Sequence, residues 1–310
     1  MHRFRLSSFG NQFRRVGRAA LHKLTAGVRS DRRAIILAGG EDGPLMTQRT
    51  ISNDIPLQFC PSFGNESMLE RTRKRVALAI PAEQTLFVVT KTQERFYRRV
   101  LADVPSSRLV VQPQNRGTAA AILYGLLRSL NVAPTAPVAI FPSEHYIADD
   151  AAFMQHIDLA FDGVRARSDV LVLLGVTPDG PDADYSWIEM GERIAQYFQL
   201  FRIKRFWQKP SPELAARLWR SGCLLNSFVM VGHIPTLLDL LMRALPELYA
   251  SFASIESEIG AASETLTLER MYADSPSINL SEEVLSPFSE QLTVLPVSGV
   301  RWSNLRKGRP

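Results

Sequence analysis

From Ala34 onward, short apolar runs alternate with longer segments that carry apolar residues three or four positions apart. The runs have the length of buried strands, and the longer segments have the period of helices that pack on one face. Such alternation is typical of a largely parallel, doubly wound sheet with helices on both faces. The expected strands are Ala34–Leu37, Thr85–Thr90, Leu109–Gln112, Val138–Phe141 and Val170–Val176, and the expected helices are Met68–Ile80, Gln93–Val104, Thr118–Leu130 and Ala151–Arg167.

The pattern changes after about residue 180, where short strand-like pieces mix with helical ones. This mixture predicts strands added to the same sheet, together with a helical cover. The expected strands of this half are Trp187–Met190, Arg202–Trp207, Phe228–Val231 and Leu292–Val297, and the expected helices are Glu213–Ser221, Pro235–Leu245 and Glu247–Ile259.

The first expected strand ends in two adjacent glycines, Gly39 and Gly40. Backbone N–H groups at such a strand end can cradle phosphates, because no Cβ blocks a close approach. Open α/β sheets bind their ligands in the crevice at this edge. A tight structural turn would explain the same two glycines, so both interpretations remain open at this point.

The net charge of +5 is unevenly distributed along the chain. Residues 1–33 carry nine Arg and Lys against one acid, a net of +8, and the remainder carries 27 basic against 30 acidic residues, a net of −3. We therefore expect a basic, disordered leader over residues 1–32, one folded domain over 33–306 and a basic tail over 307–310. The domain is not expected to bind nucleic acid. The leader could instead be an amphipathic arm that touches anionic lipid or RNA.

Hydropathy and cysteine content indicate the cellular compartment. No apolar run approaches the ~20 residues that a membrane-spanning helix needs. The two cysteines, Cys60 and Cys223, lie far apart and lack metal-ligand spacing. This favours a reducing compartment without a disulfide framework, and we expect a cytoplasmic protein without a transmembrane segment.

Ten short segments, in order along the chain, resemble one family. The segments are Ile-Leu-Ala-Gly-Gly (36–40), Gln-Phe (58–59), Met-Leu-Glu-Arg-Thr (68–72), Gln-Pro-Gln-Asn-Arg-Gly-Thr-Ala (112–119), Phe-Pro-Ser-Glu-His (141–145), Leu-Gly-Val-Thr-Pro (174–178), Tyr-Ser-Trp-Ile-Glu (185–189), Phe-Trp-Gln-Lys-Pro (206–210), Leu-Asn-Ser-Phe (225–228) and Trp-Ser-Asn-Leu (302–305). Together they are similar to the mannose-1-phosphate guanylyltransferases, which belong to the sugar-nucleotide pyrophosphorylases.

The resemblance implies a fold and a reaction. The fold would be a Rossmann-like nucleotidyltransferase domain, a GT-A-like three-layer sandwich around a mostly parallel mixed sheet. The reaction would join mannose 1-phosphate to the α-phosphate of GTP with the help of Mg²⁺, forming GDP-mannose and pyrophosphate. Partners would be the nucleotide, the sugar phosphate and a second copy in a homodimer. Catalysis of this kind depends on positioning and on neutralising charge.

The resemblance also implies roles for particular residues. Glu144 and Lys209 would be catalytic, and Glu144 and Asn304 would hold the metal. Tyr185, Glu189 and Asn226 would bind the sugar. The nucleotide would contact Leu37, Ala38, Gly39, Gly40, Gln112, Asn115, Arg116, Gly117 and Thr118.

Simpler structural roles are open for several of these residues. A helix N-terminus at Thr118, with Arg116 beside it, would favour an anion, but Thr118 could equally be a plain helix cap. Lys209 and Glu189 could be solvated residues of strands, and His145 is expected to be a hydrogen-bonded structural histidine.

The chain departs from the family pattern at charged positions. The family loop Gly-Gly-X-Gly-Thr/Ser-Arg-Leu has Asp42 in place of its third glycine and Pro44 in place of its arginine, although Arg49 could reach back. Leu57 replaces a phosphate-binding lysine, and Asn304 replaces a metal-binding aspartate. At the metal and sugar positions, Glu144 replaces an aspartate, Ser186 a glycine, Gln208 a glutamate, Leu225 a tryptophan and Arg306 a glycine.

Two functions follow from these departures. One is a guanylyltransferase with a weakened phosphate and metal site, and the other is a non-catalytic protein that binds a nucleotide sugar or a protein partner.

Overall fold

The computed structural model of this 310-residue chain describes residues 31–40, 55–63, 66–194 and 199–304. Residues 1–30 of the predicted leader, the loop residues Asp42, Pro44 and Arg49, and the predicted tail with Arg306 lie outside the described residues. The last two residues of the predicted leader do belong to the folded body. Asp31 pairs with Arg165 at 2.6 Å, and buried Arg32 forms an ion pair with Asp158.

The described chain is built on a nine-stranded mixed sheet with the strand order β5-β4-β1-β6-β11-β8-β12-β10-β9. Strands β10 and β11 run opposite to the others. The strands are β1 (Arg33–Leu37), β4 (Thr85–Thr90), β5 (Leu109–Gln112), β6 (Pro137–Pro142), β8 (Leu171–Val176), β9 (Trp187–Arg193), β10 (Phe201–Trp207), β11 (Leu224–His233) and β12 (Leu292–Val297).

Two small sheets flank the main one. β7 (His145–Ile147) pairs with β13 (Trp302–Asn304), and β2 (Pro61–Phe63) pairs with β3 (Glu66–Ser67). The first of these joins the middle of the chain to the last strand described, because Asn304 lies opposite His145.

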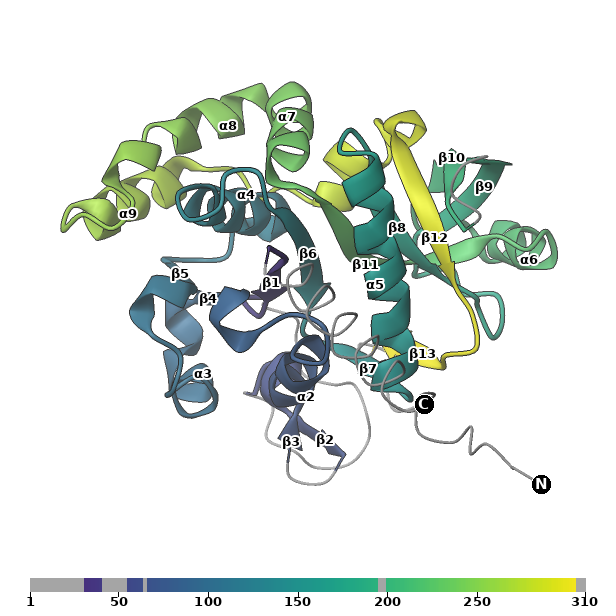
Figure 1. Cartoon of the computed structure of the whole chain (residues 1–310), viewed down its shortest axis with the longest axis horizontal. Helices are drawn as coiled ribbons and strands as arrows, with labels where there is room; N and C mark the ends of the chain where they lie inside the picture. Colours follow the sequence, from purple (N-terminus) through teal and green to yellow (C-terminus); the bar gives the residue numbers. More distant parts are fainter. Residues whose placement is uncertain (1–30, 41–54, 64–65, 195–198, 305–310) are drawn as a thin grey trace, which may run out of the picture.

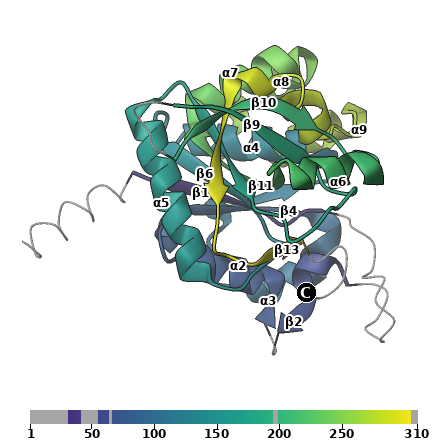
Figure 2. The same ribbon diagram turned by 90° about the vertical axis from the view of Figure 1, so that its right-hand side faces the viewer.

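Helices cover both faces of the main sheet, which makes three layers (Figure 1). In Figure 2 strands β1 and β4 lie between α4 on one side and α2 and α3 on the other. The helices are α2 (Met68–Val76), α3 (Glu94–Val100), α4 (Gly117–Leu130), α5 (Asp150–Ala166), α6 (Pro212–Arg220), α7 (Ile234–Ala244), α8 (Pro246–Ala253) and α9 (Glu264–Asp274). The predicted three-layer α/β fold with a mostly parallel mixed sheet is confirmed.

The alternation of side chains along β1 explains how one strand serves two cores. Ala34 and Ile36 face the core shared with α2, α3, α5 and α6, whereas Ile35 faces the core of α4, α7, α8 and α9. All three side chains are almost completely buried. A strand with both faces covered by helices must be apolar throughout, which is why the sequence shows a continuous run here.

Helix starts in the first half follow their capping residues. Ser67 and Glu70 form a reciprocal capping box at α2, and the side chain of Asp149 accepts a hydrogen bond from the backbone N–H of Ala152 in α5. Each cap satisfies backbone N–H groups that have no partner within the helix. The expected strands Thr85–Thr90, Leu109–Gln112 and Leu292–Val297 have the bounds that were predicted.

Helix α9, which the sequence analysis did not predict, is attached to α4 by one carboxylate. Glu264 accepts hydrogen bonds from Tyr124, from Arg128 at 2.8 and 2.9 Å and from the backbone N–H of Gly260 at 2.7 Å. Burial raises the pKa of Glu264, but these donors outweigh that effect and hold it below its ordinary value. Burial, reinforced by the Glu264 carboxylate, raises the pKa of Tyr124.

None of the helices in the described ranges is both long and apolar enough to cross a membrane. Cys60 and Cys223 are free and buried, and burial raises the pKa of both thiols.

Replacing Glu264 with glutamine (Glu264→Gln) should destabilise the fold by about 2 kcal/mol at neutral pH, because charged hydrogen bonds are lost. A carboxylate with a lowered pKa stabilises the fold above its ordinary pKa, and that stabilisation disappears as the pH falls through the folded value. The difference in the free energy of unfolding between wild type and variant should therefore shrink in acid. Urea unfolding at several pH values measures this difference. Glu94→Gln, in a pair whose side chains are 80% and 51% exposed, is the control and should cost less than about 0.5 kcal/mol. Equal losses for the two variants would contradict the assignment.

Candidate active site

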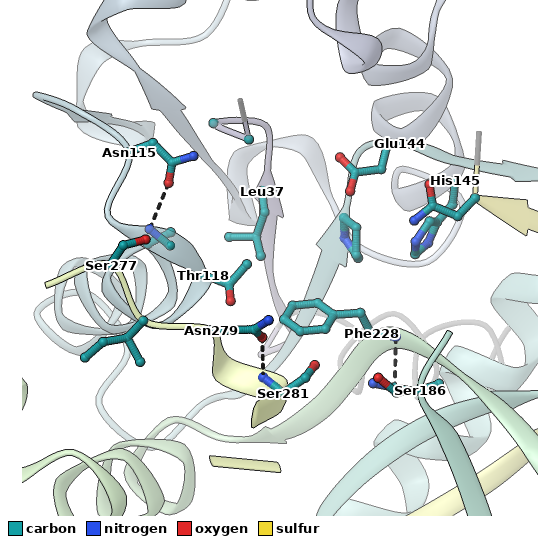
Figure 3. Close-up of a pocket in the computed structure, with 18 of the residues that line it drawn as sticks. Leu37, Asn115, Thr118, Glu144, His145, Ser186, Phe228, Ser277, Asn279 and Ser281 are labelled. Carbon is teal, nitrogen blue, oxygen red and sulfur yellow. Dashed lines mark hydrogen bonds between the residues drawn. The ribbon is translucent and has the colours of Figure 1, made fainter. Parts of the chain in front are cut away.

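A pocket of about 510 Å³ lies where several strands of the sheet end (Figure 3). Leu37, Gln112 and Pro142 are the last residues of β1, β5 and β6, and all three line it. Strand β11 runs the opposite way, so its first residues, including Asn226 and Phe228, reach the same pocket. This edge of an open α/β sheet is where ligands bind in doubly wound folds.

The two glycines that follow β1 form one wall, and their backbone carbonyls are bound by three side chains. Thr90 donates to the carbonyl of Gly39 at 2.9 Å, and Gln93 donates to that of Gly40 at 2.7 Å. Gln58 donates to Gly40 at 3.0 Å and to Ala38 at 3.2 Å. A Cβ on Gly39 would lie 2.6 Å from the Thr90 hydroxyl and 2.8 Å from the Gln112 amide, so any larger residue would have to displace these two groups.

The start of α4 forms the wall opposite. Gly117 has a φ of +80° and packs so tightly that a Cβ would lie 2.3 Å from the carbonyl oxygen of Ile278. The Asn115 side-chain oxygen accepts from the N–H of Gly117 at 2.8 Å, and the Thr118 hydroxyl accepts from the N–H of Leu280 at 3.0 Å. Backbone groups of residues 278–280 therefore occupy part of the helix terminus at which an anion was expected. Thr118 is not the cap residue, since the cap position is Arg116.

Arg116 points away from the pocket. Its guanidinium donates to the carbonyls of Tyr272 and Ala273, at 2.7 and 2.8 Å, where α9 ends. A cation there stabilises unpaired carbonyls at a helix C-terminus. Arg116 does not line the pocket, and neither does Ala38, which is buried beneath it.

The predicted sugar side contains a backbone irregularity in β11. The strand register shifts between Asn226 and Met230, and Phe228 within this bulge has a φ of +60°. The Asn226 side-chain oxygen accepts from the N–H of Phe228 at 3.0 Å, and the Ser227 hydroxyl accepts from the N–H of Val229 at 3.1 Å. These bonds hold a conformation that costs a bulky side chain about 1–3 kcal/mol.

Polar groups complete this side. The Tyr185 hydroxyl contacts both the N–H and the carbonyl of Asn304, at 3.3 and 3.4 Å. Ser186 donates to the side-chain oxygen of Gln208, whose amide nitrogen is buried and finds no partner among the described residues.

Glu189, a predicted sugar ligand, lies outside the residues that line the pocket. Its carboxylate accepts from Lys204 at 2.7 Å, and this hydrogen bond lowers the pKa of Glu189.

Glu144 and Asn304, the predicted metal residues, both line the pocket. Glu144 directly precedes β7, and Asn304 is the last residue of β13. Buried Arg75 stabilises this region from below, since it pairs with Asp150 at 2.5 Å and donates to the carbonyl of His145 at 3.4 Å. Burial lowers the pKa of Arg75, and the Asp150 carboxylate opposes the shift. His145 is buried, and its ring packs edge-on against Trp302 with 5.1 Å between centroids.

The described part of the chain holds no cluster of three or more His, Cys, Asp and Glu side chains suited to a metal ion. A carboxylate and an amide oxygen are donor types that Mg²⁺ accepts, and this ion commonly keeps several waters and takes other ligands from substrate phosphates. By donor chemistry, Glu144 and Asn304 are therefore compatible with a partial site that phosphates of a ligand would complete.

Charge in the pocket is sparse. Among its described lining residues, Lys209 is the single Lys or Arg, and Glu144 and Asp184 are the carboxylates. Lys209 has a φ of +35°; it and Phe228 are the two non-glycine residues of the described chain with positive φ. Both line this pocket, and strained backbone of this kind is concentrated at functional sites.

The structure thus brings most of the predicted site residues together. The predicted residues that line the pocket are Leu37, Gly39, Gly40, Gln112, Asn115, Gly117, Thr118, Glu144, Tyr185, Lys209, Asn226 and Asn304. The sequence analysis missed the wall formed by Ser277, Ile278, Asn279 and Ser281, as well as Asp184 and Phe228. No motif marks residues 277–281, whose place depends on contacts with α4.

Several known proteins are similar to this chain. Mannose-1-phosphate guanylyltransferase 2 of Escherichia coli O157:H7 is 24% identical over 285 residues, covering 88% of this chain and 57% of that protein. The xanthan biosynthesis protein XanB of Xanthomonas campestris pv. campestris (strain B100) is 30% identical over 198 residues, covering 62% of this chain and 40% of that protein. This chain thus spans only about half the length of these curated relatives.

The same fold is found in a solved structure from Thermus thermophilus, described as that of a mannose-1-phosphate geranyltransferase. It superimposes with a TM-score of 0.77 at 28% identity, covering 89% of this chain and 76% of that one. The resemblance to mannose-1-phosphate guanylyltransferases is thereby confirmed at low identity. The family model for nucleotidyl transferases matches residues 33–236, well over half of the chain. The chain belongs to the nucleotidyl transferase family.

Proposed function

We propose that the pocket binds GTP and mannose 1-phosphate and that the protein joins them as a mannose-1-phosphate guanylyltransferase does. A phosphate oxygen of mannose 1-phosphate would attack the α-phosphorus of GTP, the bond to the β-phosphate would break, and pyrophosphate would leave. The observation that carries the proposal is a single cavity lined both by the predicted nucleotide residues, such as Gly39 and Asn115, and by the predicted sugar residues Tyr185 and Asn226.

Each group has a role that its position supports. Lys209, exposed at the pocket wall, would neutralise charge on the transferred phosphate. The side chain of Gln208, which lines the same pocket, would lie beside the sugar. Mg²⁺ would be held by Glu144 and Asn304 together with the phosphates, and when bound it would supply positive charge to the phosphate oxygens.

A second candidate is a protein that binds a nucleotide sugar without turning it over. The sparse charge of the described lining residues favours it, because two polyanions must be held together for transfer. Leu57, at the position where the resemblance implies a lysine, is 2% exposed and packs with Met68, so it offers no charge to the pocket.

For either candidate we expect a cytoplasmic protein, because its two cysteines are free thiols and suit a reducing compartment. A homodimer stays a prediction.

Mixing the full chain with GTP, mannose 1-phosphate and Mg²⁺ should release pyrophosphate, and a metal chelator should abolish the release, because the ion offsets charge that the protein does not. A coupled pyrophosphate assay measures the rate. No release, combined with calorimetric binding of GDP-mannose, would replace the first candidate with the second. Neither release nor binding would reject both.

Lys209→Met should reduce the rate of pyrophosphate release by about 10²–10³-fold, because one preorganised charge at the reacting phosphates is lost. Lys91→Met, which removes an exposed lysine that pairs with Glu269 outside this pocket, is the matched control and should leave the rate unchanged. A Lys209 variant as active as the control would remove this residue from the proposed chemistry.

Gly39→Ala should destabilise the fold by about 1–3 kcal/mol and weaken nucleotide binding, since the new Cβ would displace the Thr90 hydroxyl and the Gln112 amide. Thermal unfolding and calorimetry with GDP measure the two effects. Gly180→Ala is the control: the added Cβ would have no neighbouring atom within 4 Å, so stability and GDP affinity should both be unchanged. Unaltered GDP affinity in a destabilised Gly39 variant would show that this wall does not contact the nucleotide.

A further inference from the structure

Phe228 has no role in the proposed chemistry, although its backbone is held in a left-handed conformation with a φ of +60°. Its neighbours Asn226, Ser227 and Val229 are buried, whereas Phe228 itself is partly exposed and lines the pocket. Glycine or asparagine would adopt this backbone more easily. A large aromatic side chain at such a position suggests that the ring itself is required.

The ring is directed into the pocket. In Figure 3 it points toward Asn279 and Ser281, on the side where Thr118 lies in the first turn of α4. Its inner side packs against the apolar core around α4. Within the described chain, no aromatic ring stacks on Phe228 and no cation lies over it. Phe228 is partly exposed and lines the pocket, so part of its ring is accessible to a ligand there.

The groups around this end of the pocket are polar and uncharged. The side-chain oxygens of Asn115 and Asn279 accept from the backbone N–H groups of Gly117 and Ser281, at 2.8 and 3.0 Å. Each amide therefore presents its NH₂ group as a donor. Hydroxyl groups of Ser277 and Ser281 also line this end. A flat aromatic surface beside uncharged hydrogen-bonding groups suits a nucleobase, which has an apolar face and a polar edge.

We propose that Phe228 binds the nucleotide by stacking on its base, with Asn279 beside it facing the edge of the base. This inference rests on the proposed function, because it assigns one part of the same pocket. The strain at Phe228 is then the cost of directing an aromatic ring at the ligand. The side chains of Asn226 and Ser227 maintain this backbone conformation by accepting hydrogen bonds from the N–H groups of Phe228 and Val229.

Calorimetry of the full chain with GDP and, separately, with mannose 1-phosphate tests the proposal. Phe228→Leu keeps an apolar side chain but removes the aromatic face, and it should weaken GDP binding by roughly 5- to 100-fold. Binding of mannose 1-phosphate should be unchanged. Phe228→Tyr keeps the ring and should bind GDP within about twofold of wild type. Thermal unfolding of both variants shows whether each is folded.

Three results would overturn the proposal in distinguishable ways. If wild type binds GDP and Phe228→Leu binds it equally well, the stacking role is rejected while the proposed function stands. If Phe228→Leu binds GDP more tightly, the ring obstructs the ligand and does not stack on it. If wild type binds neither GDP nor mannose 1-phosphate, the proposed function fails and the inference fails with it. Should Phe228→Leu be unfolded, Phe228→Gly, which relieves the backbone strain, replaces it with the same expectation for GDP.

Discussion

The close packing of the Gly39–Gly40 backbone against neighbouring strand ends is the constraint on which the pocket depends. Carbonyl groups just beyond a strand have lost their partners in the sheet, and Gln58, Gln93 and Thr90 supply new ones. Because glycine has no Cβ, Gln112 of β5 can lie directly beside this backbone. The carboxyl ends of β1, β4 and β5 are thereby held together, and this leaves a wall of backbone along which a ligand can lie.

The strain in the structure is located around this wall. Lys209 and Phe228 come from different parts of the chain, yet both have positive φ and both line the pocket. Positive φ values cost free energy, so they persist only where the surrounding structure imposes them. At Phe228 the imposing groups are the side chains of Asn226 and Ser227, which accept the backbone N–H groups freed by the bulge. In a strand without a bulge, these backbone N–H groups would instead bond to the neighbouring strand. The bulge adds a residue that the regular register of the sheet cannot pair.

The sequence predicts the elements that depend on local pattern. Strand Thr85–Thr90 is apolar, is bounded by turns and was predicted with its observed bounds, and α4 begins one residue before its predicted start. Helix α9 was missed because few of its residues are buried and it depends on Glu264 bonding to α4. In the site, family motifs located the residues at strand ends. Arg116 and Glu189 were expected there too. Arg116 instead binds the end of α9, and Glu189 binds Lys204, and no local pattern in the sequence specifies either partner.

A tertiary contact also removes one expected charge from the described pocket. Arg116 caps the carbonyls at the end of α9 and does not line the cavity. What remains around the cavity is a set of amides in one recurring arrangement. Asn115, Asn226 and Asn279 each accept the backbone N–H two residues ahead, so each turns its NH₂ group outward from its own turn. Neutral donors of fixed orientation select ligands by the position of acceptor oxygens and nitrogens, and they respond little to salt, whereas a lysine-rich groove attracts any polyanion. Under the proposed function, these walls would recognise the base and sugar of the nucleotide sugar more readily than its phosphates. Lys209 is the one Lys or Arg among the described lining residues, and it would meet the phosphate charge.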